Sequence, residues 1–172
     1  MSTSIDLTAT AGLPAPSELE ESAAAILHRG SIINDSLQRA HARWSLLADA
    51  YEAPEQFQVR GGMDLPRTAG EAVLQAASHA ASALRAFAGA VEEIRRKRLE
   101  LQAEAGELLE KENNCPAPTG ALPAGNVPPS LPALLLQSRA DQLALELSAA
   151  EDECMRALAR LERSDGAERR GL

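Results

Sequence analysis

The sequence predicts an all-α protein, in which an antiparallel helical hairpin or coiled coil is joined by a third long helix to give a three-helix bundle. Hydrophobic residues make up 45% of the 172 residues, but aromatic residues only 2%. That composition disfavours sandwiches and barrels, whose strands are rich in aromatic and β-branched residues. In three long stretches, apolar residues recur at alternating steps of three and four, the pattern of helices packed at a shallow angle.

The first helix is expected to start at Ser17, because Ser17 and Glu20 have the spacing of a capping box. Residues 1–16, which are small and polar, are expected to form a disordered or loosely docked arm. The predicted apolar seam is Ala23, Ile26, Gly30, Ile33, Leu37, Ala40, Trp44, Leu47 and Tyr51. Gly30 on this seam either lets a neighbouring backbone approach closely or kinks the helix.

Pro54 is expected to end or bend the first helix, because the residue before a proline avoids the α region. It also suits the first position of a short turn in which Phe57 and Val59 pack over the end of the bundle. Gly61-Gly62 is then predicted to break the chain, and Pro66 to keep it broken.

A second capping box, from Thr68 to Glu71, predicts a helix from about Ala69 to Asn113. Its seam is Val73, Ala77, Ala80, Leu84, Phe87, Val91, Ile94, Arg98, Leu101, Ala105 and Leu108. Arg98 is the only charged residue on the seam. It either snorkels, pairs with a glutamate of another helix, or marks a point where the apolar contact thins.

The region 114–131 is rich in proline and glycine and is predicted to be a linker. The third helix is expected over 132–164, and 165–172 is expected to be a frayed tail. Its seam is Leu136, Ala140, Leu143, Leu147, Ala150, Cys154, Ala157 and Leu161. Cys154 is therefore expected to be a small buried apolar residue. This helix either completes a bundle with the hairpin of 17–113 or pairs with another chain.

Composition and charge disfavour several classes of function. The net charge of −8 and the pI of about 4.9 disfavour nucleic-acid binding. No apolar stretch approaches the ~20 residues that a membrane span requires. The N-terminus lacks the features of a signal peptide, so we expect a cytoplasmic protein that is exported, if at all, without one. Cys115 and Cys154 could pair with each other, but they do not form the disulfide framework of a small secreted domain, so free thiols are expected.

Catalytic chemistry is not indicated, so the sequence predicts a protein that is not an enzyme and has no cofactor or metal. His28, His41 and His79 have no Cys, Asp or Glu at the spacing of zinc ligands. No glycine-rich phosphate loop is present, and the carboxylates fall on solvent-facing helix positions. Function is therefore expected to depend on protein partners.

The run Trp44-Ser-Leu-Leu47, followed by Tyr51-Glu-Ala-Pro-Glu55, resembles the end of the first helix in a group of actinobacterial helical-hairpin proteins. That group is similar to the WXG family of small hairpins handled by type VII (ESX-type) secretion. The resemblance covers residues 17–113, and Met63 also suits the pattern. Leu46 stands where a WXG motif has glycine, and Trp44 precedes the turn. Tyr51 and Glu55 match the family's Tyr-x-x-x-acid export signal, which usually follows the second helix.

The resemblance implies a helical protein partner, either a second copy or a neighbouring effector, and contact with the secretion machinery. The chain would be a WXG-like partner, escort or substrate of a type VII system. The partner-binding residues would be Trp44, Leu47, Tyr51, Pro54 and Glu55. Trp44 is either a core or interface anchor or a recognition residue for the machinery. The alternative is a cytoplasmic coiled-coil scaffold or regulator unrelated to secretion.

Overall fold

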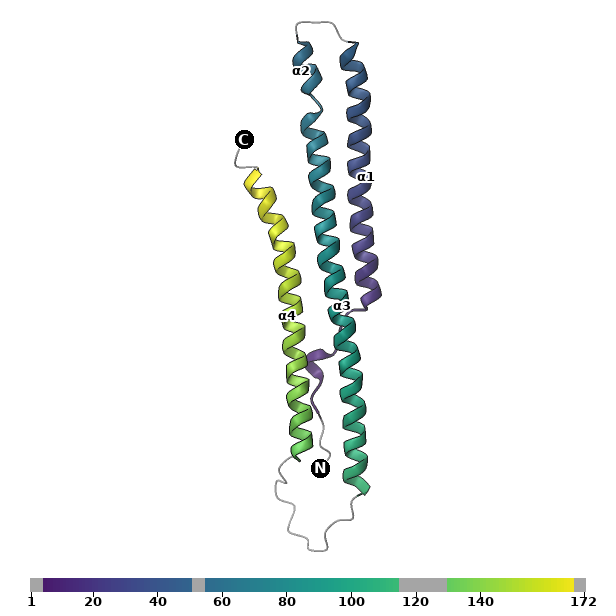
Figure 1. The fold of residues 1–172 in the computed structure, drawn as a ribbon, viewed down its shortest axis with the longest axis vertical. Coiled ribbons are helices and arrows are strands. Elements are labelled where there is room, and N and C mark those ends of the chain that lie inside the picture. Colours follow the sequence, from purple (N-terminus) through teal and green to yellow (C-terminus); the bar gives the residue numbers. More distant parts are fainter. Residues whose placement is uncertain (1–4, 51–54, 115–129, 169–172) are drawn as a thin grey trace. The chain divides into compact units, whose positions relative to one another are not determined.

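The computed structural model describes residues 5–50, 55–114 and 130–168, and within them helix is the only regular structure (Figure 1). The elements are η1 (Thr8–Thr10), α1 (Pro16–Asp49), α2 (Gln56–Gly61), α3 (Asp64–Asn114) and α4 (Leu131–Glu168). The all-α prediction is confirmed. The chain divides into unit 1, Met1–Pro16 with Gly89–Asp152, and unit 2, Ser17–Ala88 with Glu153–Leu172.

Two helices begin earlier than their capping boxes predict. Helix α1 begins at Pro16, so Ser17 lies inside the first turn. Proline suits this position because the first N–H groups of a helix have no intrahelical partner. Helix α3 begins at Asp64 instead of Ala69. The Thr68 hydroxyl donates to the Asp64 carbonyl at 2.9 Å, so Thr68 lies within the helix and the second capping box was wrong.

The break between α2 and α3 is shorter than predicted. Pro66 lies in the first turn of α3, where a missing N–H costs nothing, and it does not prolong the break. Phe57 does not pack over the end of the helices, because its side chain is 87% exposed. Val59 is half-buried. The predicted bend at Pro54 lies outside the described residues.

Helix α4 exceeds its predicted range of 132–164 at both ends, and it continues past Gly166, which does not stop it. Its predicted seam is buried or half-buried from Leu136 to Leu161, including Cys154. Most of the predicted linker, residues 115–129, lies outside the described residues, as does the end of the tail.

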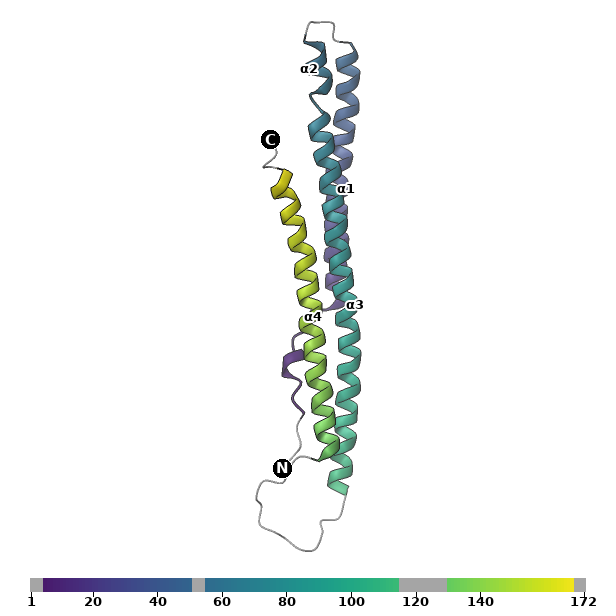
Figure 2. The ribbon, with the colours of Figure 1, turned by 60° about the vertical axis from the view of Figure 1, so that its left-hand side comes forward.

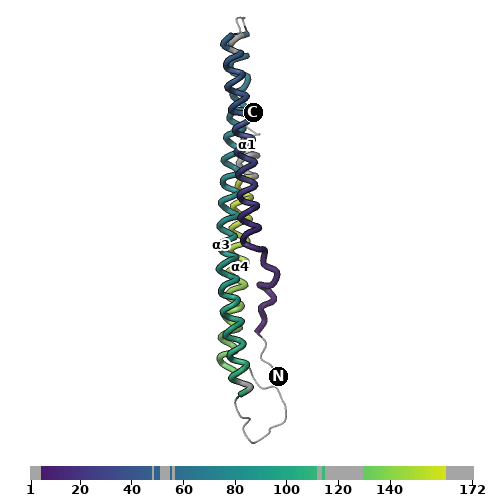
Figure 3. The backbone as a smooth tube through the Cα atoms, turned by 90° about the vertical axis from the view of Figure 1, so that its right-hand side faces the viewer, coloured from purple at the N-terminus to yellow at the C-terminus, as the bar shows by residue number. Residues whose placement is uncertain are grey.

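In unit 2, α1 runs alongside the first part of α3 (Figure 3). Glycines mark the close approach of the two helices. A Cβ atom built on Gly30 would lie 2.5 Å from the Cβ of Ala77. One built on Gly70 would lie 2.9 Å from Cδ1 of Leu37. Helix α1 is unbroken at Gly30, so of the two alternatives the structure shows the close approach.

The contact face of α1 departs from the predicted seam. Ile33 is 45% exposed and Ala40 is exposed, whereas Asn34 and His41, one residue further on, are half-buried. Leu47 is 67% exposed. A strict seven-residue repeat drifts relative to a straight helix of 3.6 residues per turn. The prediction assumed the strict repeat and therefore displaced the seam by one residue at these points.

In unit 1, the second part of α3 packs on the first part of α4 through residues of both predicted seams. The buried side chains include Val91, Ile94, Leu101, Ala133, Leu136, Ala140, Leu143 and Leu147. Lys97 pairs with Glu146 at 2.8 Å, and Arg139 pairs with Glu104. Arg98 is half-buried, and its Nε is enclosed without a hydrogen-bond partner in the described part of the chain.

The N-terminal arm is docked in its described part, residues 5–16, although the sequence predicted disorder or loose docking. The Asp6 N–H donates to Oε1 of Gln137 in α4 at 3.0 Å. Arg95 of α3 donates from Nη2 to the carbonyl of Leu13 at 2.7 Å. Thr10 is only 1% exposed. The arm therefore contacts both helices of unit 1.

Asp6 is expected to control the order of this arm. Its carboxylate accepts from the hydroxyl and the N–H of Thr8, and these bonds hold the pKa of Asp6 below its ordinary value. Because the pKa of Asp6 is lowered in the folded chain, its carboxylate stabilises the folded arm at pH values above the ordinary pKa of aspartate. That stability is lost as the pH falls through the lowered pKa. Asp6→Ala should therefore accelerate hydrogen exchange at Thr8 and Thr10, measured by NMR, whereas Asp35→Ala should not. Unchanged exchange in Asp6→Ala would contradict this role.

Candidate interaction surface

Trp44 joins the end of α1 to the segment that follows it. Its indole Nε1 donates to the carbonyl of Val59 in α2 at 2.6 Å. Gly62 lies against the ring, since a Cβ built there would be 3.5 Å from Cζ2 of Trp44. The side chain remains 36% exposed. Trp44 therefore packs within the chain and also presents part of its ring to solvent.

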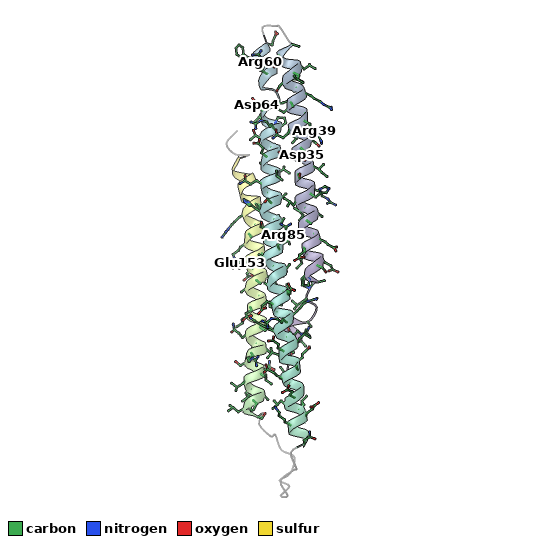
Figure 4. The ribbon with its side chains drawn as sticks, turned by 45° about the vertical axis from the view of Figure 1, so that its right-hand side comes forward. Asp35, Arg39, Arg60, Asp64, Arg85 and Glu153 are labelled. Carbon is green, nitrogen blue, oxygen red and sulfur yellow. The ribbon has the colours of Figure 1, made fainter. Side chains whose placement is uncertain are left out.

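Three polar pairs connect the same end of α1 to α2 and α3. They are Asp49 with Arg60 at 3.7 Å, His41 with Asp64 at 3.3 Å, and Gln38 with Glu71 at 3.1 Å. Two members, Arg60 and Asp64, are labelled in Figure 4. Exposed pairs of this kind contribute at most about 1 kcal/mol each. Their main effect is to fix which residues of α1 face which residues of α2 and α3.

The structure places three of the five predicted partner-binding residues. Leu47 faces solvent, and Trp44 is partly buried as described above. Glu55 is the exposed N-cap residue of α2, and its side chain makes no capping hydrogen bond. Tyr51 and Pro54 lie outside the described residues.

As α1 advances, its contacts move back along α3 to the turn that precedes it. Gly30 meets Ala77 and Leu37 meets Gly70, both on α3, and Trp44 meets Gly62, the residue that caps α2. Positions three residues after a contact residue fall on one side of two helices that run in opposite directions. Ile33 and Leu47 hold this place on α1, and Val73 and Leu65 hold it on α3.

These four residues, with the exposed part of Trp44, form a surface that we call the tip strip: Ile33, Trp44, Leu47, Leu65 and Val73. Their exposed fractions run from 36% for Trp44 to 76% for Leu65. Sequence reasoning found Trp44 and Leu47 but missed Leu65, and it assigned Ile33 and Val73 to covered seams. Each of these three residues lies three positions after a glycine at the helix contact, and that spacing is the signal that would have located them.

A second apolar surface lies in unit 1. A groove of about 540 Å³ between α3 and α4 has Leu108, Pro132, Leu135 and Leu136 among its lining residues. The charged residues in its lining are satisfied by one another, because Glu104 pairs with Arg139 and Glu107 with Lys111. These pairs leave no charged group to select a ligand.

The described residues contain no group of three or more His, Cys, Asp and Glu side chains that could hold a metal ion. Burial raises the pKa of the Cys154 thiol, which lowers the fraction of reactive thiolate. None of the described helices combines the length and the hydropathy that crossing a bilayer requires. Among the described residues, the tip strip therefore remains as the candidate functional site.

No protein-family model matches the chain, and neither a curated protein nor a solved structure matches it. The WXG-like resemblance therefore depends on the sequence pattern alone, chiefly on the residues from Trp44 to Glu55. The surface that the tip strip forms is the basis for assigning a function.

Proposed function

We propose that the chain is a non-enzymatic protein–protein interaction module. The hairpin formed by α1 and the first part of α3 would bind a helical partner through the tip strip. The observation that carries this proposal is that five large apolar side chains are 36–76% exposed at positions that helical spacing places on one side of that helix pair. Complete burial of such a side chain contributes about 1.5–3 kcal/mol, so covering the strip favours association.

In this proposal α4 is the third helix of the module's own bundle. Its C-terminal part belongs to the same unit as α1 and the first part of α3. There Cys154, Ala157 and Leu161 are half-buried, as expected of a helix that already packs within its own chain. The strip is then the site left for a second copy or another protein.

The resemblance of Trp44 to Glu55 supports a role as a WXG-like partner, escort or substrate of a type VII secretion system. Leu47 and Glu55 are exposed, so they are accessible to a protein that recognises this end of the hairpin. One observation favours the alternative of a cytoplasmic scaffold. The bond from Trp44 to the Val59 carbonyl gives the tryptophan a structural task that needs no secretion partner.

The test is the mass in solution by light scattering, for the chain alone and co-expressed with its genomic neighbours. We expect a species heavier than the 18.2 kDa monomer in at least one case. Leu47→Asp should return the chain to the monomer mass, because a carboxylate on the strip must be desolvated on binding. A mass of 18.2 kDa under all conditions would refute the proposal.

Leu145→Asp is the matched control. Leu145 is 65% exposed, almost the same as Leu47, but it lies on α4 in unit 1. Loss of the complex in both variants would mean that the strip is not the binding surface. Release of the chain into the culture medium, lost in Leu47→Asp but not in Leu145→Asp, would separate the secretion role from the scaffold role.

A further inference from the structure

We infer that the tip strip binds one acidic amphipathic helix, supplied by a different protein, which lies in line with α4. The inference rests on the proposed function and specifies the partner. Two observations carry it. The strip continues a face of α3 that is half-buried where α4 lies beside it, and the α1 edge of the strip is positively charged.

The α3 part of the strip belongs to a longer apolar stripe. At steps of three and four residues the stripe runs through Leu65, Ala69, Val73, Ala76, Ala80, Ala83 and Phe87. From Ala76 to Phe87 these residues are half-buried, whereas Val73, Ala69 and Leu65 are exposed.

The change in exposure along the stripe follows the end of α4. In unit 2, α4 lies beside α3 and ends before the level of α2 (Figures 1 and 2), and Glu153 of α4 lies near the level of Arg85 (Figure 4). Past the end of α4, the stripe has no described element beside it except α1. A helix is the element that extends this packing, because the exposed residues keep the same helical spacing.

The edge of the strip on α1 is positive. Arg29 lies one helical turn before Ile33, and Arg43 one turn before Leu47, which places each guanidinium group beside an exposed strip residue. Both arginines are exposed, and no ion pair among the described residues involves either one. The α3 edge is close to neutral, because residues 72–84 include no Lys, Arg, Asp or Glu, and the charged residues of 64–71 are paired, Asp64 with His41 and Arg67 with Glu71.

This charge pattern disfavours the pairing of two strips, one from each of two copies. The strip of a second copy would bring the same two arginines and the same neutral edge, so it offers neither Arg29 nor Arg43 a carboxylate. Residues 29–88 hold six arginines and six acidic residues, so the net charge of −8 lies outside them. Glutamates beside the apolar seam of a separate helix would complement the arginines. Arg43 follows Arg29 by fourteen residues, a separation of about 21 Å along α1, which corresponds to about four turns of that helix.

Trp44 is the only tryptophan in the chain, so its fluorescence reports occupation of the strip directly. The probes are two synthetic helical peptides of four to five turns without tryptophan, identical in their leucine seam. One carries glutamate and the other lysine at the flanking positions. We expect a blue shift of Trp44 emission with both, and about fivefold or greater tighter binding of the glutamate peptide at low salt, declining as salt is added.

The charge-reversed chain Arg29→Glu with Arg43→Glu should prefer the lysine peptide. Arg85→Glu with Lys111→Glu is the matched control, because it makes the same change in net charge at two exposed positions of α3 outside the strip, the second of them in unit 1. Arg85 is labelled in Figure 4. The control should keep the preference for the glutamate peptide. Circular dichroism of all variants establishes that they remain helical.

Three results would overturn the inference: no binding of either peptide, equal affinity for both, or an unchanged preference after reversal of Arg29 and Arg43. A dimer that the peptides cannot dissociate would show that a second copy occupies the strip. The proposed function fails separately. If Leu47→Asp still abolishes a heavier complex while the glutamate peptide does not bind, the module stands and only the acidic partner is wrong.

Discussion

Gly30→Ala is expected to lower the free energy of unfolding by about 1–3 kcal/mol, the usual cost of overpacking a close contact. In an isolated helix the same change would be favourable by about 1 kcal/mol. The steric term should win because the new Cβ would lie 2.5 Å from the Cβ of Ala77. Neither atom can rotate away, since each is fixed to its backbone, so α1 and α3 would have to separate locally.

Glycines elsewhere on α3 provide the controls. A Cβ built on Gly89 or Gly106 meets nothing within 4 Å, so each Gly→Ala change there should stabilise the chain by up to about 1 kcal/mol. Adding Ala77→Gly to Gly30→Ala should recover much of the lost stability, because it removes the opposing methyl group. Urea denaturation followed by circular dichroism measures all four variants. If Gly30→Ala stabilised the chain as Gly89→Ala should, the close approach would be wrong.

The sequence could predict the helices and most of the α3 and α4 seams because apolar periodicity is a local property. The sequence could not decide whether Gly30 allows a close approach or kinks the helix, because the residue that decides, Ala77, lies on another helix. The capping box at Thr68 failed because Asp64 begins the helix one turn earlier. Asn34 and His41 entered the contact face of α1 because a straight helix does not follow the strict repeat.

The candidate site was predictable only in part, for a similar reason. Leu47 and Trp44 attracted attention through their local pattern, but the strip also needs Leu65 and Val73 from α3. Which side of α3 stays open depends on where α4 ends, and no short stretch of sequence carries that information. The charge of the α1 edge, by contrast, is readable from the spacing of Arg29 and Arg43 once the strip is known.

Trp44→Ala is expected to cost about 2–3 kcal/mol of unfolding free energy. Removal of a fully buried tryptophan costs about 3–5 kcal/mol, and the exposed fraction of 36% reduces that figure. Trp44→Phe keeps the ring near Gly62 but loses the bond to the Val59 carbonyl, so it should cost only about 1 kcal/mol. Leu47→Asp, at an exposed site, should change stability by no more than about 0.5 kcal/mol.

Measuring both stability and partner binding in these three variants shows whether Trp44 is a structural anchor within the chain or a residue that the partner contacts directly. If Trp44 is an anchor, partner binding in Trp44→Phe should be close to wild type once the protein is folded, while Leu47→Asp abolishes it. If Trp44 is read directly by the partner, Trp44→Phe should weaken binding well beyond its loss of stability. The hydrogen bond to Val59 favours the first outcome, because an indole N–H already engaged within the chain is not free to bind a partner.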